Sequence, residues 1–295
     1  MPARAMVALL AVAASACNAA DPSARNSTPV APPPIEIPQA AQTPVYPPSH
    51  LRGMRAAAMG DFDEMASRGF VRVLATTSRT HYQSLNGFRN GRTHDAAETL
   101  QKVLNARPGV KPIGVVILET PEDQLIPDLL AGKGDVAANV RLTFARDEQV
   151  SFATPVRSGI RELVVTGPND KPLVSLEDVG GRTIHVRAAS DHYLSLVRLN
   201  EQLRKIDRPP AIIVEASAGT TDEDLLEAVN SGRLPATITD DYIFDKWKAQ
   251  FTNLAANRDV AVSQDGVIAW VTRKDTPKML SVLNDFFSSH RLTFE

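Results

Sequence analysis

Few residues of this 295-residue chain combine a reactive side chain with a spacing that supports catalysis. The single cysteine, Cys17, ends an apolar run and lacks a base and an orienting group around it, so neither a disulfide nor a cysteine nucleophile is expected. The six histidines show neither H-x-x-x-H nor H-E-x-x-H spacing, and no metal site or other cofactor is predicted. No carboxylate pair, G-x-S-x-G elbow or P-loop stands out. The sequence therefore predicts no catalytic residues.

Residues 1–16 have the pattern of a secretory signal: Arg4 precedes an apolar stretch that small residues close. The stretch is too short for a membrane-spanning helix of ~20 residues. Ala14-Ser15-Ala16-Cys17 resembles the lipobox of bacterial lipoproteins, in which the cysteine after the cleavage site carries the lipid. Plain cleavage by the ordinary signal peptidase is the alternative. Both interpretations place the protein outside the cytoplasm, in the periplasm, and the first anchors it to a membrane through a lipid on Cys17.

The segment from residue 18 to residue 50 holds nine prolines among Ala, Ser, Thr and Gln, with few charges. Such a segment cannot bury enough apolar surface to offset its ordering entropy. It predicts an extended tether, and a leader without a role is the alternative. The whole chain is 43% hydrophobic with a net charge of −2, which is typical of a globular protein and gives no electrostatic reason to expect a nucleic-acid partner.

Beyond residue 60, short β-branched runs alternate with helical segments, which is typical of βα units around a mainly parallel sheet. Thr120 as N-cap and Pro121 at the first helical position predict where one helix begins. Strands are predicted at 71–75, 114–118, 135–139, 160–166, 183–187, 211–215, 236–239 and 266–272, and helices at 94–106, 121–131, 191–205, 222–230 and 277–290.

Taken in order, several segments resemble the family 3 extracellular solute-binding proteins, and among them the substrate-binding module of the membrane-bound lytic murein transglycosylase F enzymes. The resemblance is carried by 71–74 with 78–82, 122–130 with 134–138, 142–146 with 150–155, and 223–226 with 236–241. It implies an α/β, two-lobed periplasmic-binding-protein type 2 fold, in which each lobe is a mainly parallel sheet flanked by helices. Two crossing segments join the lobes, and the ligand binds in the cleft between them.

The resemblance and the patterns together divide the chain into five parts. We expect a signal peptide, an anchor cysteine with its tether, a helical lead-in, a first lobe built from two stretches of chain, and a second lobe, at 1–16, 17–50, 51–68, 69–158 plus 263–295, and 159–262 respectively.

The resemblance also implies roles for particular residues. In amino-acid-binding relatives, an arginine at the position of Arg146 pairs with the ligand's carboxylate, and a carboxylate at the position of Asp240 receives its ammonium group. Both pairings suit the chemistry of these groups. Thr143 would add a hydroxyl donor and Tyr82 an aromatic wall. The loop at Ser190, where a helix opens, would present backbone N–H groups to an anion.

Each of these residues also has a purely structural interpretation. Arg146 could pair at the surface with the acidic residues that follow it. Asp240 could cap the helix after it, and Asp241 beside it leaves the assignment open by one residue. Tyr82 could belong to the core. The chain departs from the family at Arg141, where many relatives have Ser or Thr, and this second cation predicts either a more acidic ligand or a blocked pocket.

The sequence thus predicts a cell-envelope solute-binding protein, not an enzyme, that closes two lobes around a small zwitterionic ligand. The ligand would be amino-acid-like or cell-wall-peptide-like, bound for transport with an ABC permease or for sensing. The alternative is a non-catalytic regulatory module of a separate transglycosylase, because the chain ends where the catalytic domain of that enzyme would begin. A third possibility is an envelope interaction surface that binds no small molecule. No lytic activity is expected.

Overall fold

The computed structural model describes residues 53–106, 111–188 and 190–290, which all belong to one compact unit. The predicted signal, Cys17 and the proline-rich tether lie outside these residues. Within the described ranges, no helix is long and apolar enough to cross a membrane.

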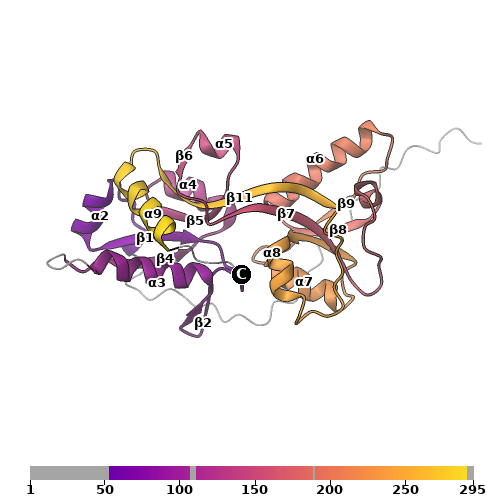
Figure 1. The fold of residues 1–295 in the computed structure, drawn as a ribbon, viewed down its shortest axis with the longest axis horizontal. Helices are drawn as coiled ribbons and strands as arrows, with labels where there is room; N and C mark the ends of the chain where they lie inside the picture. Colours follow the sequence, from indigo (N-terminus) through magenta and orange to yellow (C-terminus); the bar gives the residue numbers. More distant parts are fainter. Residues whose placement is uncertain (1–52, 107–110, 189, 291–295) are drawn as a thin grey trace, which may run out of the picture. The chain divides into compact units, whose positions relative to one another are not determined.

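A nine-stranded sheet has the order β4-β1-β5-β11-β7-β10-β8-β9, with β6 paired to β11 (Figure 1). A separate hairpin consists of β2 (Gln83–Leu85) and β3 (Phe88–Asn90). The strands of the large sheet are β1 (Phe70–Ala75), β4 (Gly114–Glu119), β5 (Val136–Arg141), β6 (Val150–Phe152), β7 (Arg157–Thr166), β8 (Thr183–Arg187), β9 (Ile212–Ala216), β10 (Ala236–Asp240) and β11 (Ala261–Arg273).

Strand direction divides this sheet into two lobes. In the first lobe β1 pairs in parallel with β4 and β5, and in the second lobe β8 pairs in parallel with β9 and β10. β7 and β11 pair antiparallel with each other. β11 also pairs antiparallel with β5 of the first lobe, and β7 with β10 of the second, so β7 and β11 are the two crossing segments (Figure 1). The predicted two-lobed α/β fold is confirmed. The residue bounds of the lobes stay predictions.

Helices cover both faces of each lobe's sheet, and they bury a stripe of apolar residues that recur at helical spacing. In the first lobe, Met279, Leu283 and Phe286 of one helix pack into the same core as Trp270 of β11. In the second lobe, Leu196, Leu199 and Leu203 do the same against Ile184 of β8. The helical elements are α2 (Phe62–Arg68), α3 (Arg92–Asn105), η1 (Glu122–Gln124), α4 (Leu125–Leu130), α5 (Phe144–Asp147), η2 (Leu176–Val179), α6 (Asp191–Lys205), α7 (Asp222–Asn230), α8 (Asp241–Trp247) and α9 (Pro277–Ser289).

The predicted bounds of β8, α6 and α7 agree with the structure, and the other predicted elements differ at one or both ends, most of all β11 and the helix predicted from residue 121. β11 starts earlier than predicted, because the crossing segment pairs with β7 as a strand. The predicted N-cap at Thr120 is wrong: its N–H donates to Ala75 O and its hydroxyl to Leu118 O, which extends the hydrogen bonding of β4. Pro121 precedes the 3-10 turn η1, which leads into α4.

Candidate functional site

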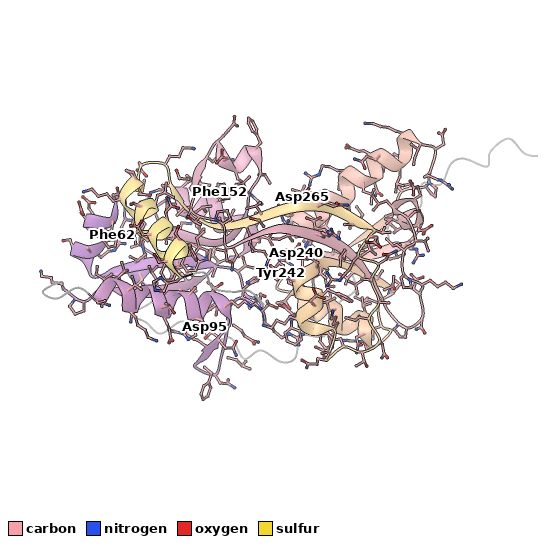
Figure 2. The ribbon with its side chains drawn as sticks, viewed as in Figure 1. Phe62, Asp95, Phe152, Asp240, Tyr242 and Asp265 are labelled. Atoms are coloured by element: carbon pink, nitrogen blue, oxygen red, sulfur yellow. The ribbon has the colours of Figure 1, made fainter. Side chains whose placement is uncertain are left out.

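A cavity of about 110 Å³ is lined by residues of both lobes. This volume is below the roughly 300–1,000 Å³ that is usual for small-molecule pockets. Asp240 and Tyr242 lie where the two lobes meet (Figure 2). The polar side chains that line the cavity are Thr76, Thr77, Ser78, His81, Glu122, Asn139, Arg141, Arg146, Arg187, Asp191, His192, Asp222, Asp240 and Tyr242.

The ends of the strands explain why these side chains converge. Arg141 is the last residue of β5, Arg187 the last of β8 and Asp240 the last of β10. Asp191 and His192 open α6, directly after β8. In open α/β sheets the carboxyl ends of the strands and the helix starts that follow them line the ligand crevice. The topology therefore gathers charged residues from distant parts of the chain at one place.

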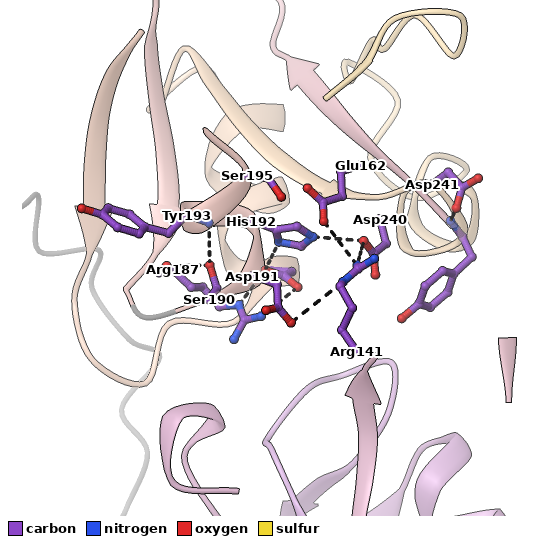
Figure 3. Close-up of polar contacts among 12 residues, drawn as sticks. Arg141, Glu162, Arg187, Ser190, Asp191, His192, Tyr193, Ser195, Asp240 and Asp241 are labelled. Carbon is purple, nitrogen blue, oxygen red and sulfur yellow. Dashed lines mark hydrogen bonds and ion pairs between the residues drawn. The ribbon is translucent and has the colours of Figure 1, made fainter. Parts of the chain in front are cut away.

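Asp240 is the centre of a buried ionic cluster (Figure 3). Its Oδ1 accepts a hydrogen bond from Arg141 Nη2 at 2.5 Å and contacts His192 Nε2 at 3.1 Å. Burial would raise the pKa of Asp240, but the hydrogen bond from His192 and the charge of Arg141 lower it to about 2. Asp240 occupies the N-cap position of α8, but its side chain makes no capping bond. Asp241 Oδ1 accepts from Tyr242 N instead, so Asp240 is the carboxylate that faces the cavity.

His192 contributes a second positive charge to this cluster. Burial would lower the pKa of His192, but its hydrogen bond to Asp240 and the charges of Asp240, Asp222 and Glu162 raise it to about 9. Ligand atoms of Glu162, His192 and Asp240 lie within 4.8 Å of one another, a grouping that would suit a metal ion. In this structure the side chain of Arg141 contacts the carboxylates of both Glu162 and Asp240. Sequence spacing missed this trio because its members come from three different elements.

Arg146 pairs across the cavity with the second lobe. Its Nη1 donates to Asp191 Oδ2 at 2.9 Å and to Arg141 O at 3.0 Å. The pairing with the acidic residues that follow it, considered from the sequence, is absent from the ion pairs of the described residues. Thr143 caps α5 by accepting a hydrogen bond from Arg146 N, and it is not among the residues that line the cavity. Thr143 therefore positions Arg146, and the expected contact of its hydroxyl with a ligand stays a prediction.

Two residues expected in the pocket are not among those that line the cavity. Tyr82 is 2% exposed and packs in the core of the first lobe, and its backbone forms an antiparallel bridge with Ser78. The expected aromatic wall is supplied instead by Tyr242, whose hydroxyl lies 2.8 Å from His81 Nε2. Ser190 is buried: its hydroxyl caps α6 by accepting from Tyr193 N and donates to Arg187 O. Its side chain therefore stabilises the start of the helix, and the expected binding of an anion by the backbone N–H groups of this loop stays a prediction.

Arg187 was not expected from the sequence and links the two lobes. It donates to Asp222 Oδ1 and, through Nη1, to Glu122 Oε2 of the first lobe, both at 2.7 Å. Burial would lower the pKa of Arg187, but the charges of Asp222 and Glu122 raise it. The sequence could have indicated Arg187, because Arg187 ends a predicted strand and Asp222 begins a predicted helix. Both positions lie at the ligand-binding edge of such a sheet.

Fold and site together define a two-lobed binding protein with an ionic cavity between its lobes. A profile of the bacterial extracellular solute-binding proteins, family 3, matches residues 71–292. The chain belongs to this family.

Solved structures with the same fold include proteins of the amino-acid-binding type. The arginine-bound, truncated ArgBP from T. maritima is 21% identical, with a TM-score of 0.62, and the match covers 77% of this chain and 99% of that one. AbpA from Streptococcus pneumoniae, bound to L-arginine, is 15% identical, with a TM-score of 0.62, over 77% of this chain and 91% of that one.

A sequence relative is the membrane-bound lytic murein transglycosylase F of Desulfosudis oleivorans. It is 26% identical over 166 residues, which is 56% of this chain and 35% of that enzyme. The chain thus spans about a third of the length of this relative.

Proposed function

We propose that this protein is a cell-envelope receptor whose lobes close around a small amino-acid-like or cell-wall-peptide-like solute, for transport or sensing. The observation that carries the proposal is that a guanidinium, Arg146, and a carboxylate, Asp240, both line the same cavity. A guanidinium fork matches a carboxylate, and a desolvated ammonium group needs a fixed anion. The arginine-bound relatives of the same fold support this ligand class.

Binding would work through the hinge formed by β7 and β11. A solute that contacts both lobes stabilises the closed arrangement over the open one by its differential affinity for the two. Arg146 would hold the solute's carboxylate from the first lobe. Asp240 would hold its cationic group from the second, once that group displaces the guanidinium of Arg141 from this carboxylate. An ABC permease is the expected partner in transport, and a signalling domain would take its place in sensing.

A thermal-shift screen against amino acids and muropeptides, followed by calorimetry, tests the proposal. A solute at a hundred times its Kd adds about 2.7 kcal/mol to the free energy of unfolding, which shifts Tm by several degrees in a protein of this size. Arg146→Ala should abolish the shift. Arg204→Ala, on an exposed turn of α6 away from the cavity, is the matched control and should keep it. Unchanged affinity in Arg146→Ala would remove this residue from the site.

A second candidate is a non-catalytic regulatory module of a lytic murein transglycosylase F-type system, favoured by the 26% identity to such an enzyme. In this function the bound muropeptide would modulate a separate catalytic subunit. Digestion of purified peptidoglycan by a transglycosylase, with and without this protein, tests the candidate. Release of muropeptides by this protein alone would contradict the non-catalytic role.

Membrane anchoring through Cys17 is part of the first proposal. The family is extracellular by description, and the sequence before Cys17 has the signal pattern described above. Mass spectrometry of the mature N-terminus should find a lipid on Cys17. Cys17→Ser should move the protein from the membrane fraction to the soluble fraction, and an unlipidated N-terminus on the wild-type protein would contradict the anchor.

A further inference from the structure

We infer that Arg141 is a built-in ligand of the second lobe: its guanidinium occupies the cation subsite around Asp240 and holds the lobes together without a solute. The chemical class that this subsite recognises is therefore a guanidinium. The inference rests on the proposed function in one respect only, namely that the cavity is where a solute binds.

The subsite is built from carboxylates of two strands and one helix of the second lobe. Arg141 Nη2 lies 2.5 Å from Asp240 Oδ1 and 3.6 Å from Glu162 Oε1, and Arg141 Nε lies 3.9 Å from Asp191 Oδ2. The Arg141 side chain is 12% exposed, and that of Glu162 is 1% exposed. Glu162 Oε2 is buried and has no hydrogen-bond partner among the described residues, so the subsite keeps acceptor capacity beyond what Arg141 uses.

The backbone also makes room for the guanidinium. A Cβ on Gly266 of β11 would clash with Arg141 Nη1, so a larger residue there would displace this guanidinium from its present position. Arg141 itself comes from β5 of the first lobe. Arg141 thus places a guanidinium of the first lobe among carboxylates of the second lobe. There it makes the contact that a cationic solute would otherwise make.

Other contacts between the lobes fit the same closed arrangement. Glu223, fully buried at the start of α7, accepts hydrogen bonds from Ser78 Oγ and Thr80 N of the first lobe, each at 2.9 Å. Trp247 Nε1 donates to Thr80 Oγ1 at 2.9 Å. The Thr80 N–H also donates to Ser78 Oγ of its own lobe at 3.1 Å. Its exchange therefore reports on closure through the loss of the shorter bond to Glu223, which exists only while the lobes are in contact.

An internal ligand competes strongly with solutes in solution. Because Arg141 is tethered beside its subsite, its effective concentration is of the millimolar order or higher. A free guanidinium compound should bind poorly to the wild-type protein for this reason. Removing the Arg141 side chain should expose the carboxylates and convert the second lobe into a receptor for small guanidinium compounds.

The test uses the full chain, methylguanidinium as the probe, calorimetry for binding, and hydrogen exchange at Thr80 for closure. Wild type should give no binding heat and a protected Thr80 amide. Arg141→Ala should exchange at Thr80 about tenfold faster or more, as expected when a local contact opens. Methylguanidinium should bind to Arg141→Ala and restore the protection. Adding Asp240→Asn to this variant should abolish the binding, and Arg204→Ala should behave as wild type.

Three results would overturn the inference. The first is a folded Arg141→Ala protein that does not bind methylguanidinium. The second is a dicarboxylate that binds to wild type and is lost in Arg141→Ala, because Arg141 would then face the solute. The third is unchanged exchange at Thr80. If Arg141→Ala does not fold, Arg141→Gln serves in its place with the same expectations. Failure of the amino-acid and muropeptide screen on both wild type and Arg141→Ala would count against the proposed function alone.

Discussion

His192 gives the protein a pH-dependent stability whose sign and range follow from its surroundings. It is buried against Asp240, Glu162 and Asp222, and its pKa rises from 6.5 to about 9 in the folded state. A group whose pKa is higher when folded stabilises the native state fully below its unfolded pKa. That contribution is lost as pH rises through the folded pKa, so we expect stability to fall between pH 6.5 and about pH 9.

The magnitude follows from the size of the pKa change. A rise of about 2.5 in the pKa of His192, at about 1.4 kcal/mol for each pKa unit, corresponds to about 3 kcal/mol of unfolding free energy. With an m-value of about 3 kcal/mol per molar urea, the unfolding midpoint should fall by about 1 M over this range. His81 does not interfere, because burial lowers its pKa to about 4 and its effect falls in the acidic range.

The assay is urea unfolding followed by tryptophan fluorescence at pH values from about 6 to about 9.5. His192→Gln keeps a polar side chain beside Asp240 but does not titrate. Groups elsewhere in the chain titrate in both proteins, so the difference between wild type and variant isolates His192. His94→Gln, on the outer face of α3, is the control and should follow wild type. Parallel pH profiles for wild type and His192→Gln would refute the reasoning.

Two matched pairs of substitutions test the buried ion pair that stabilises the fold and the hydrogen bonds that stabilise the closed arrangement. Asp135→Asn leaves Arg72, whose side chain is 1% exposed, without its anion and should lower the unfolding free energy by about 3–5 kcal/mol. Asp128→Asn, which disrupts an exposed pair with Lys133, should cost at most about 1 kcal/mol by the same urea titration. Glu223→Gln should cost about 1–3 kcal/mol and speed exchange at Thr80, whereas the exposed Glu227→Gln should leave Thr80 protected. Equal effects within either matched pair would contradict the role assigned to burial.

Local sequence was sufficient where an element is specified by its own residues. The capping box from Thr221 to Asp224 and the apolar spacing of α6 specify their helices without help from the rest of the chain. Local sequence was not sufficient where pairing with a distant strand decides whether a segment is a strand and where that strand ends. β6 and the hairpin of β2 and β3 are too short to give a periodic pattern, and β11 is longer than its apolar core because β7 pairs with it.

The residues of the candidate site also fall into two groups, those that the sequence indicated and those that only the structure revealed. Arg146 and Asp240 were identified through the family resemblance, and both line the cavity. The sequence could not decide whether Tyr82 belongs to the core or to the pocket wall, because an aromatic residue after a strand suits either place equally well. His192 and Glu162 carry no local signal, since a histidine in a helix and a glutamate in a strand gain their role only from the partners that surround them.

The sequence by itself determined the class of fold and predicted an export signal, because apolar periodicity, caps and signal patterns are local properties of the chain. It also raised the question of Arg141, whose charge departs from the family pattern, and left open an acidic ligand or a blocked pocket. Only the tertiary structure could answer, because the three carboxylates around that guanidinium come from β7, β10 and α6. A pocket's charge balance depends on distances between such segments, and no single segment of sequence contains them.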